Sequence, residues 1–175
     1  MATTYEAIAT VTVGSGGAAN IEFTSIPGTY TDLCLLYSIR SAGSYDNVSI
    51  RFNSNTSSYS TRRLLGNGSS VSSDTTSGVS GSPGSAALCG AIPGTSQTAN
   101  TFGNQLVYIP NYASSNFKSV SCDSVDENNA TGANAEMTAS LWSNTSAITS
   151  IRLLGYHANN FAEYSTATLY GIKNS

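Results

Sequence analysis

The sequence predicts an all-β protein, an antiparallel β-sandwich of jelly-roll type. Short segments in which apolar and polar residues alternate recur along the chain, about ten in all, and each is a candidate strand. Clusters of Gly, Pro, Asn and Ser separate these segments, and no helical period extends beyond one turn. This pattern is typical of antiparallel sandwiches and jelly rolls. The length of 175 residues suits a single domain that covers residues 1–175.

The clearest candidate strand lies within residues 25–40, SIPGTYTDLCLLYSIR. Pro27 has the φ that the first corner of a turn requires, and Gly28 can adopt the positive φ of the second corner. The alternation after this turn predicts a central strand, and we expect its apolar face to point into the sandwich. The residues on that face are Leu33, Leu35, Tyr37 and Ile39.

The same alternation predicts the other strands in order along the chain. In the first half, strands are expected at residues 7–13, 21–23, 48–52 and 59–65. In the second half, strands are expected at residues 86–92, 102–109, 117–122, 135–142, 148–156 and 166–172.

Two segments lack the alternation and are predicted to be loops. Residues 66–85, GNGSSVSSDTTSGVSGSPGS, form a Gly/Ser-rich segment that is unusually long for a loop inside a compact domain. It is either a solvated excursion on the surface or an arm that packs on a neighbouring subunit. Residues 123–134 are acidic and rich in Asn, so we expect a loop there as well.

The composition argues against two classes of partner. Charged residues make up 10% of the chain, the net charge is -3, and only Arg62 and Arg63 are adjacent basic residues. Nucleic-acid binding needs clustered Lys and Arg, so we expect no such partner. The N-terminal segment has no signal-peptide pattern, and no apolar run approaches the length of a membrane span. We therefore expect a soluble protein with no membrane partner.

The search for catalytic chemistry depends on one residue, because His157 is the only histidine. The base of a Ser-His-Asp or Cys-His site is usually a histidine. His157 follows a predicted strand in the loop GYHANN, and no nucleophile-elbow motif occurs in a strand-to-helix context. A lone histidine in a loop is usually a surface residue, so we expect no catalytic residues and no enzyme. The sequence does not exclude a pair of carboxylates at the separation that glycosidases use.

Metal ligands and cofactors are not expected either. The three cysteines Cys34, Cys89 and Cys122 are widely separated and form no CxxC, so we predict three free thiols that are buried or half-buried. One acidic segment offers oxygen ligands that could hold calcium, although it lacks the spacing of an EF-hand. A sequence of this kind more commonly forms an acidic hairpin loop without a metal ion. The residues of this segment are Asp123, Asp126, Glu127, Asn128 and Asn129.

Several tyrosines are expected to be exposed. Exposed aromatic rings can stack on sugars, but tyrosine is also common in protein interfaces and in cores, and those uses are favoured here. The residues are Tyr45, Tyr59, Tyr112, Tyr156 and Tyr164.

Four segments carry motifs that occur together elsewhere. They are MATTYEAIATVTVGSGGAANIEFTSIPGTYTDLCLLYSIR, VSIRFNSN, RLLGNGSSVSS and SAITSIRLLGYHANNFAEYSTATLYGIK. With these segments the chain resembles a family of small virion proteins of tailed bacteriophages. Members share a start of the type MATTYEPIAT, a SIP-x-TYTDL corner, an RFN strand, an LxGxGSS loop and an ending of the type STxTLYGIK. The resemblance extends over most of the chain and is weakest between Asp74 and Ala135.

The resemblance implies a structural or binding role without catalytic residues, as a capsid-surface or tail-fibre-like component. Nothing in the sequence resembles the shaft of a fibre, so we expect a capsid decoration (cement) protein that stabilises the shell. It would be assembled in the host cytoplasm and lie on the virion surface as a homo-oligomer, a trimer, bound to the major capsid protein or another virion protein. The alternative is a tail-fibre or tail-tip module that binds a host receptor or carbohydrate. A glycan hydrolase ranks third.

Overall fold

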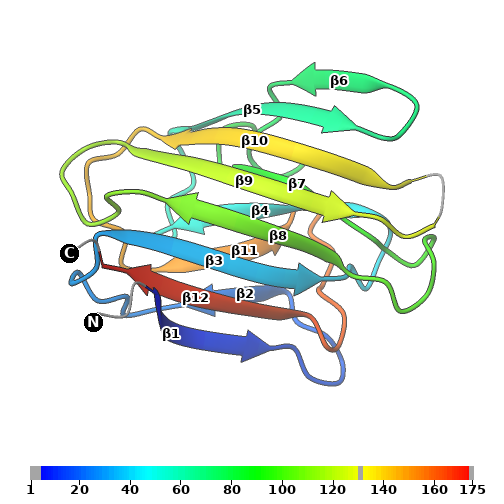
Figure 1. Cartoon of the computed structure of the whole chain (residues 1–175), viewed down its shortest axis with the longest axis horizontal. Coiled ribbons are helices and arrows are strands. Elements are labelled where there is room, and N and C mark those ends of the chain that lie inside the picture. Colours follow the sequence, from blue (N-terminus) through cyan, green and yellow to red (C-terminus); the bar gives the residue numbers. More distant parts are fainter. Residues whose placement is uncertain (1–4, 130–131, 174–175) are drawn as a thin grey trace.

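The computed structural model describes residues 5–129 and 132–173, and these residues form two antiparallel sheets packed face to face (Figure 1). The described part of the chain contains no helix, and therefore none that could cross a membrane. The prediction of an all-β sandwich is confirmed. Every predicted strand overlaps an observed strand, although the first or last residue differs for several of them.

The larger sheet has eight strands, and each pairs antiparallel with its neighbours. In spatial order they are β1 (Tyr5–Thr12), β12 (Thr166–Ile172), β3 (Asp32–Ile39), β8 (Gly103–Ile109), β9 (Lys118–Asp126), β10 (Asn134–Trp142), β5 (Tyr59–Gly66) and β6 (Val71–Asp74).

The smaller sheet lies behind it in the view of Figure 1 and has four strands, also antiparallel. In spatial order they are β2 (Asn20–Phe23), β11 (Ile151–Gly155), β4 (Asp46–Phe52) and β7 (Ala87–Ile92). The inward residues of the two sheets interleave as one core, because alternate residues of each strand point to the same face.

The predicted central strand is β3, which pairs with β12 on one side and with β8 on the other. Its four expected inward residues are all buried, and Leu33, Leu35 and Ile39 have no exposed surface. The turn before β3 differs from the prediction. Gly28 does not adopt a positive φ, and Ser25 does instead, at φ 55°. The Pro-Gly pair therefore lies in the turn without supplying its left-handed residue.

Residues 66–85 are not a structureless loop, and this part of the prediction is wrong. Strand β6 lies within them and pairs with β5. The segment that follows lies on the outer face of the smaller sheet. There the Ser49 hydroxyl donates to the Gly78 carbonyl at 2.7 Å, and the Ser80 N–H donates to the Tyr156 carbonyl at 2.8 Å. These contacts satisfy backbone groups within the same chain.

Residues 123–126 also differ from the expected loop, because they continue β9. The acidic residues Asp123 and Asp126 lie on this continuation, where pairing with β8 and β10 satisfies the backbone. Their low strand propensity is outweighed by these two neighbours. The expectation of a loop holds only for the residues between β9 and β10, of which 130–131 lie outside the described residues.

Candidate functional site

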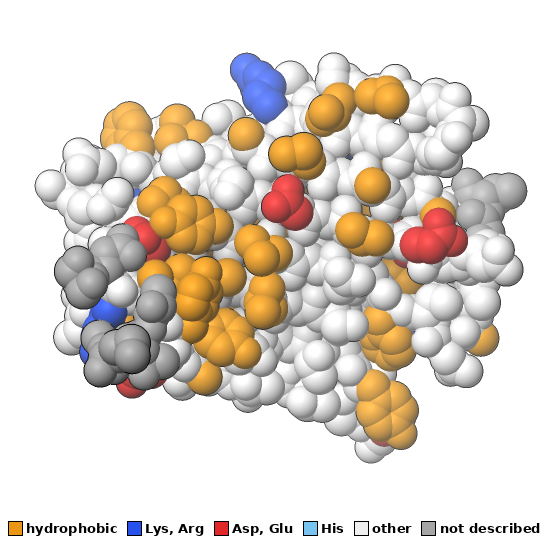
Figure 2. All heavy atoms as spheres, in the orientation of Figure 1, with side chains coloured by type: hydrophobic (Ala, Val, Ile, Leu, Met, Phe, Trp, Pro, Cys, Tyr) orange, Lys and Arg blue, Asp and Glu red, His pale blue; other side chains and the backbone are white. Residues whose placement is uncertain are grey.

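The outer face of the eight-stranded sheet carries a row of exposed apolar side chains. The strand pairing places five residues side by side across β3, β8, β9, β10 and β5, and all five point away from the core. They are Leu36, Leu106, Asp123, Met137 and Leu64. The four apolar members are 41% to 62% exposed. Figure 2 shows apolar side chains spread over this face with few charged groups between them.

A second, parallel row extends the apolar character of this face. Val125 on β9 is 45% exposed and Val71 on β6 is 75% exposed, and Ala135 lies beside Val125 on β10. Two shallow grooves of about 520 and 410 Å³ lie on this face, and Asp123 and Val125 border both. Soluble proteins rarely leave many large apolar side chains together in water, and such surfaces usually contact another macromolecule. We call the two rows together the apolar outer face.

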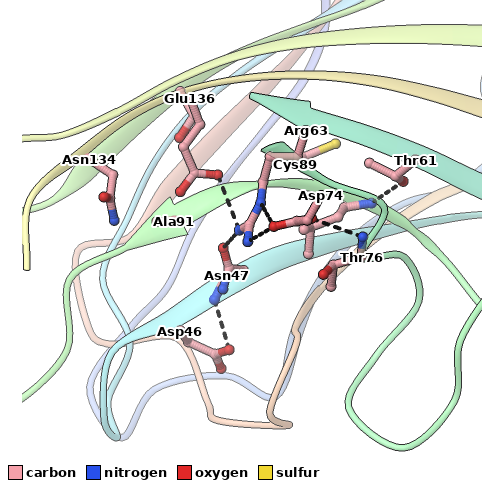
Figure 3. Close-up of polar contacts among 12 residues, drawn as sticks. Asp46, Asn47, Thr61, Arg63, Asp74, Thr76, Cys89, Ala91, Asn134 and Glu136 are labelled. Atoms are coloured by element: carbon pink, nitrogen blue, oxygen red, sulfur yellow. Dashed lines mark hydrogen bonds and ion pairs between the residues drawn. The ribbon is translucent and has the colours of Figure 1, made fainter. Parts of the chain in front are cut away.

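A partly buried ionic cluster under this face holds the β5–β6 hairpin in place (Figure 3). The Arg63 guanidinium donates to Asp74 Oδ2 at 2.6 and 3.1 Å and to Asn47 Oδ1 at 3.3 Å. It also lies 3.6 Å from Glu136 Oε2. The cluster thus joins β5 to β6, to β10 and to β4 of the other sheet. Because Leu64 is next to Arg63 on β5, the cluster also fixes the end of the apolar outer face.

The two carboxyl groups around Arg63 respond to it differently. The Glu136 side chain is only 1% exposed, and this burial raises its pKa above the ordinary value although Arg63 acts in the opposite direction. Partial burial would also raise the pKa of Asp74, but hydrogen bonds from Arg63 and Thr76 outweigh it, and the pKa lies below its usual value. Asp74 is therefore well stabilised as a carboxylate, and Glu136 is not.

His157 lies in the loop after β11, as expected, and its side chain is 51% exposed. Its Nδ1 lies 2.9 Å from Oδ1 of Asp46, a residue with no exposed surface. Among the described residues, no Ser, Thr or Cys side chain hydrogen-bonds to the His157 ring. The structure therefore brings a buried acid to the histidine without bringing a nucleophile into hydrogen-bonding contact.

The acidic segment considered for calcium does not converge on one point. Asp123, Glu127 and Asn129 are exposed, whereas Asp126 and Asn128 are buried and hydrogen-bonded to each other at 3.1 Å. Within residues 5–129 and 132–173, no group of three His, Cys, Asp or Glu side chains could hold a metal ion. The three cysteines are free and buried, which confirms that prediction.

The tyrosines expected at the surface divide into three groups. Tyr59 and Tyr112 are buried, and Tyr59 forms part of an aromatic cluster with Phe52 and Trp142, so the expectation of exposure is wrong for both. Tyr45 and Tyr156 are partly buried, and Tyr164 is 71% exposed. Burial of the two tyrosines follows from inward positions on β5 and near the Pro27 turn, which tertiary contacts alone define.

Sequence reasoning missed the residues that matter most here, namely the apolar outer face, Arg63 and Asp46. Alternation in strands such as β3 and β10 signalled two faces, but it could not show that the outer face would also be apolar. The chain was compared with protein-family models, curated proteins and solved structures, and nothing matches it.

Proposed function

We propose that this chain is a non-enzymatic structural protein of a tailed-bacteriophage virion, a capsid decoration protein that stabilises the shell. The observation that carries the proposal is the apolar outer face, because exposed Leu, Met and Val side chains on a rigid sheet are suited to protein contact. The resemblance to small phage virion proteins supplies the setting. The protein would lie on the virion surface after assembly in the host cytoplasm.

The proposal includes jelly-roll connectivity, which the strand order supports. Without the hairpins β5–β6 and β9–β10, the remaining strands form two sheets of four, β1-β12-β3-β8 and β2-β11-β4-β7. Eight strands in two such sheets are the arrangement of a jelly roll. The two hairpins then extend one sheet of the jelly roll. The two hairpins contribute Asp123, Met137 and Leu64 of the first row and all residues of the second row. Most of the apolar outer face therefore lies on these two hairpins.

The oligomer that we propose is a trimer bound to the major capsid protein or to another virion protein. A closed trimer suits the local three-fold positions of a capsid lattice. Many copies, each held by a modest contact, would strengthen the shell together. Residues 66–85 are attached to their own subunit, because β6 pairs with β5 and Gly78 and Ser80 form hydrogen bonds within the chain. A role for this segment as an arm on a neighbouring subunit stays a prediction.

The experiment compares phage particles that lack the protein with complete particles. A decoration protein binds only the assembled shell and stabilises it by mass action, so particles without it should release DNA at a lower temperature yet adsorb normally to cells. The competing proposal, a tail-tip module that binds a receptor or carbohydrate, predicts the reverse. If particles that lack the protein keep their thermal stability but fail to adsorb, the decoration proposal is wrong and the tail-tip proposal replaces it.

A further inference from the structure

A groove of about 520 Å³ lies on the other side of the molecule, on the outer face of the four-stranded sheet. Arg51 on β4 and Leu154 on β11 form its floor, since their neighbours in sequence point into the core. With these two residues included, four separate segments of the chain line the groove. Its main lining residues are Asn20, Arg51, Ser80, Leu154, Tyr156 and His157.

The walls of the groove are held in place by hydrogen bonds. The Ser80 N–H donates to the Tyr156 carbonyl at 2.8 Å, which ties the segment after β6 to the loop after β11. The Tyr156 N–H in turn donates to the Asn47 carbonyl at 2.8 Å. At Gly155 a Cβ atom would lie 2.7 Å from Asp46 Oδ2, so only glycine allows the loop to approach this closely. The groove is therefore a preformed feature of the fold.

Asp46 orients the histidine at one end of the groove. Its buried carboxylate accepts hydrogen bonds from the His157 N–H at 3.0 Å and from Asn159 Nδ2 at 3.1 Å, besides contacting His157 Nδ1 at 2.9 Å. A carboxylate at Nδ1 favours the tautomer that carries its proton there. In this tautomer Nε2 carries no proton, so it can accept a hydrogen bond from a ligand.

Arg51 gives the groove a positive charge that no acid of the described chain neutralises by an ion pair. Its Nε and Nη2 donate to the carbonyl and the hydroxyl of Ser85 at 3.0 and 3.4 Å, and both acceptors are neutral. Its neighbour across the strand pair is Arg152, whose own partner is Glu22 at 2.9 Å. A ligand that carries a carboxylate would compensate this charge.

We propose that this groove binds an acidic saccharide, a sugar chain that contains uronic acid units. Tyr156 and Leu154 offer apolar surface to the C–H face of a sugar ring. Asn20, Ser80 and His157 offer donors and acceptors to its hydroxyl groups, and Arg51 binds the carboxylate. Sugars combine these features, with one apolar face and a rim of hydroxyls, whereas a purely apolar ligand would leave the polar groups unpaired. The site goes beyond the structural role proposed above and does not depend on it.

The test titrates the purified protein with a trisaccharide of galacturonic acid and with the neutral galactose trisaccharide of the same linkage, by calorimetry and by ¹H–¹⁵N NMR. We expect saturable binding of the acidic trisaccharide, with shifts at Arg51 and Tyr156 and none at Met137. Arg51→Gln should weaken binding about tenfold or more by removing a charged hydrogen bond. Tyr156→Ala should also weaken it, and Arg62→Gln, an exposed arginine on the opposite sheet, should not.

Three results would overturn the proposal. They are the absence of saturable binding of the acidic trisaccharide to the wild-type protein, equal affinity for the acidic and neutral trisaccharides, and an equal loss of affinity in Arg51→Gln and Arg62→Gln. The NMR mapping uses the wild-type protein, so it decides the matter even where a variant fails to fold. Failure of this test leaves the capsid proposal standing, because the thermal stability of particles is measured separately.

Discussion

Removal of Arg63 at the centre of the partly buried ionic cluster should be the most informative single change. In Arg63→Met the Glu136 carboxylate, 1% exposed and 3.6 Å from the guanidinium, loses its only ion-pair partner among the described residues. Breaking a buried pair by removing one member typically costs about 3–5 kcal/mol, because a charge is left buried and unpaired. Arg63 keeps 16% of its side chain exposed, so we expect the lower end, about 3 kcal/mol.

The assay is urea unfolding at pH 7, monitored by near-ultraviolet circular dichroism. Most of the loss should come from Glu136, since Asp74 is 35% exposed and stays solvated without its partner. The double variant Arg63→Met/Glu136→Gln should therefore be more stable than Arg63→Met alone. Hydrogen exchange should also show faster opening of β6, which the cluster ties to the rest of the sheet.

The pH dependence of Arg63→Met supplies a second readout with a definite sign. Burial raises the pKa of Glu136 in the folded protein, and without Arg63 nothing in the cluster opposes this effect. A carboxyl group with a raised pKa destabilises the folded state above that pKa, and the penalty is relieved as the pH falls toward the ordinary value of 4.5. The difference in unfolding free energy between Arg63→Met and the wild type should therefore become smaller as the pH falls. A difference below about 1 kcal/mol at pH 7, or one that does not change with pH, would refute this reasoning.

Three further predictions concern the core, acid stability and the apolar outer face. Leu35→Asp places an unpaired charge at a position with no exposed surface and should cost several kcal/mol, so a variant that unfolds at the wild-type urea concentration would contradict the inward orientation of Leu35. The pKa of Asp74 in the folded protein lies below its usual value of 3.8, so the ionised carboxylate stabilises the folded state at neutral pH. This stabilisation is lost as the pH falls through the folded pKa. Urea unfolding between pH 7 and 2 should show the loss in the wild type and a smaller loss in Arg63→Met. Met137→Gln should change the unfolding free energy by no more than about 0.5 kcal/mol, because the side chain is 62% exposed and a neutral residue adds no charge opposite Asp123. It should weaken binding to undecorated shells about 5- to 30-fold, since about 1–2 kcal/mol of burial is available there. Tyr164→Gln, a change at an exposed site off the sheet, is its control, and equal binding of both variants would contradict a contact through the apolar outer face.

The sequence by itself determined the strands, because the alternation that encodes them is local. In β3 each second residue is apolar, and pairing on both sides then buries Leu33, Leu35 and Ile39. The pattern of period two survives any arrangement of the neighbouring strands, since successive side chains of a strand point to opposite faces. Strand β6 was missed because VSSD has a single apolar residue, and only its pairing with β5 and the contact of Arg63 with Asp74 make it a strand.

The tertiary structure alone decided which surfaces are available for function. Leu35 and Leu36 are adjacent and equally apolar, yet one is fully buried and the other is 41% exposed, because only the first faces the second sheet. The row that includes Leu36 and Met137 exists because strands far apart in the sequence pair in one register. Asp46 and His157 are likewise 111 residues apart and meet only across β4 and the end of β11. Alternation is a property of neighbours in the chain, whereas burial, charge pairing and exposed faces depend on neighbours in space.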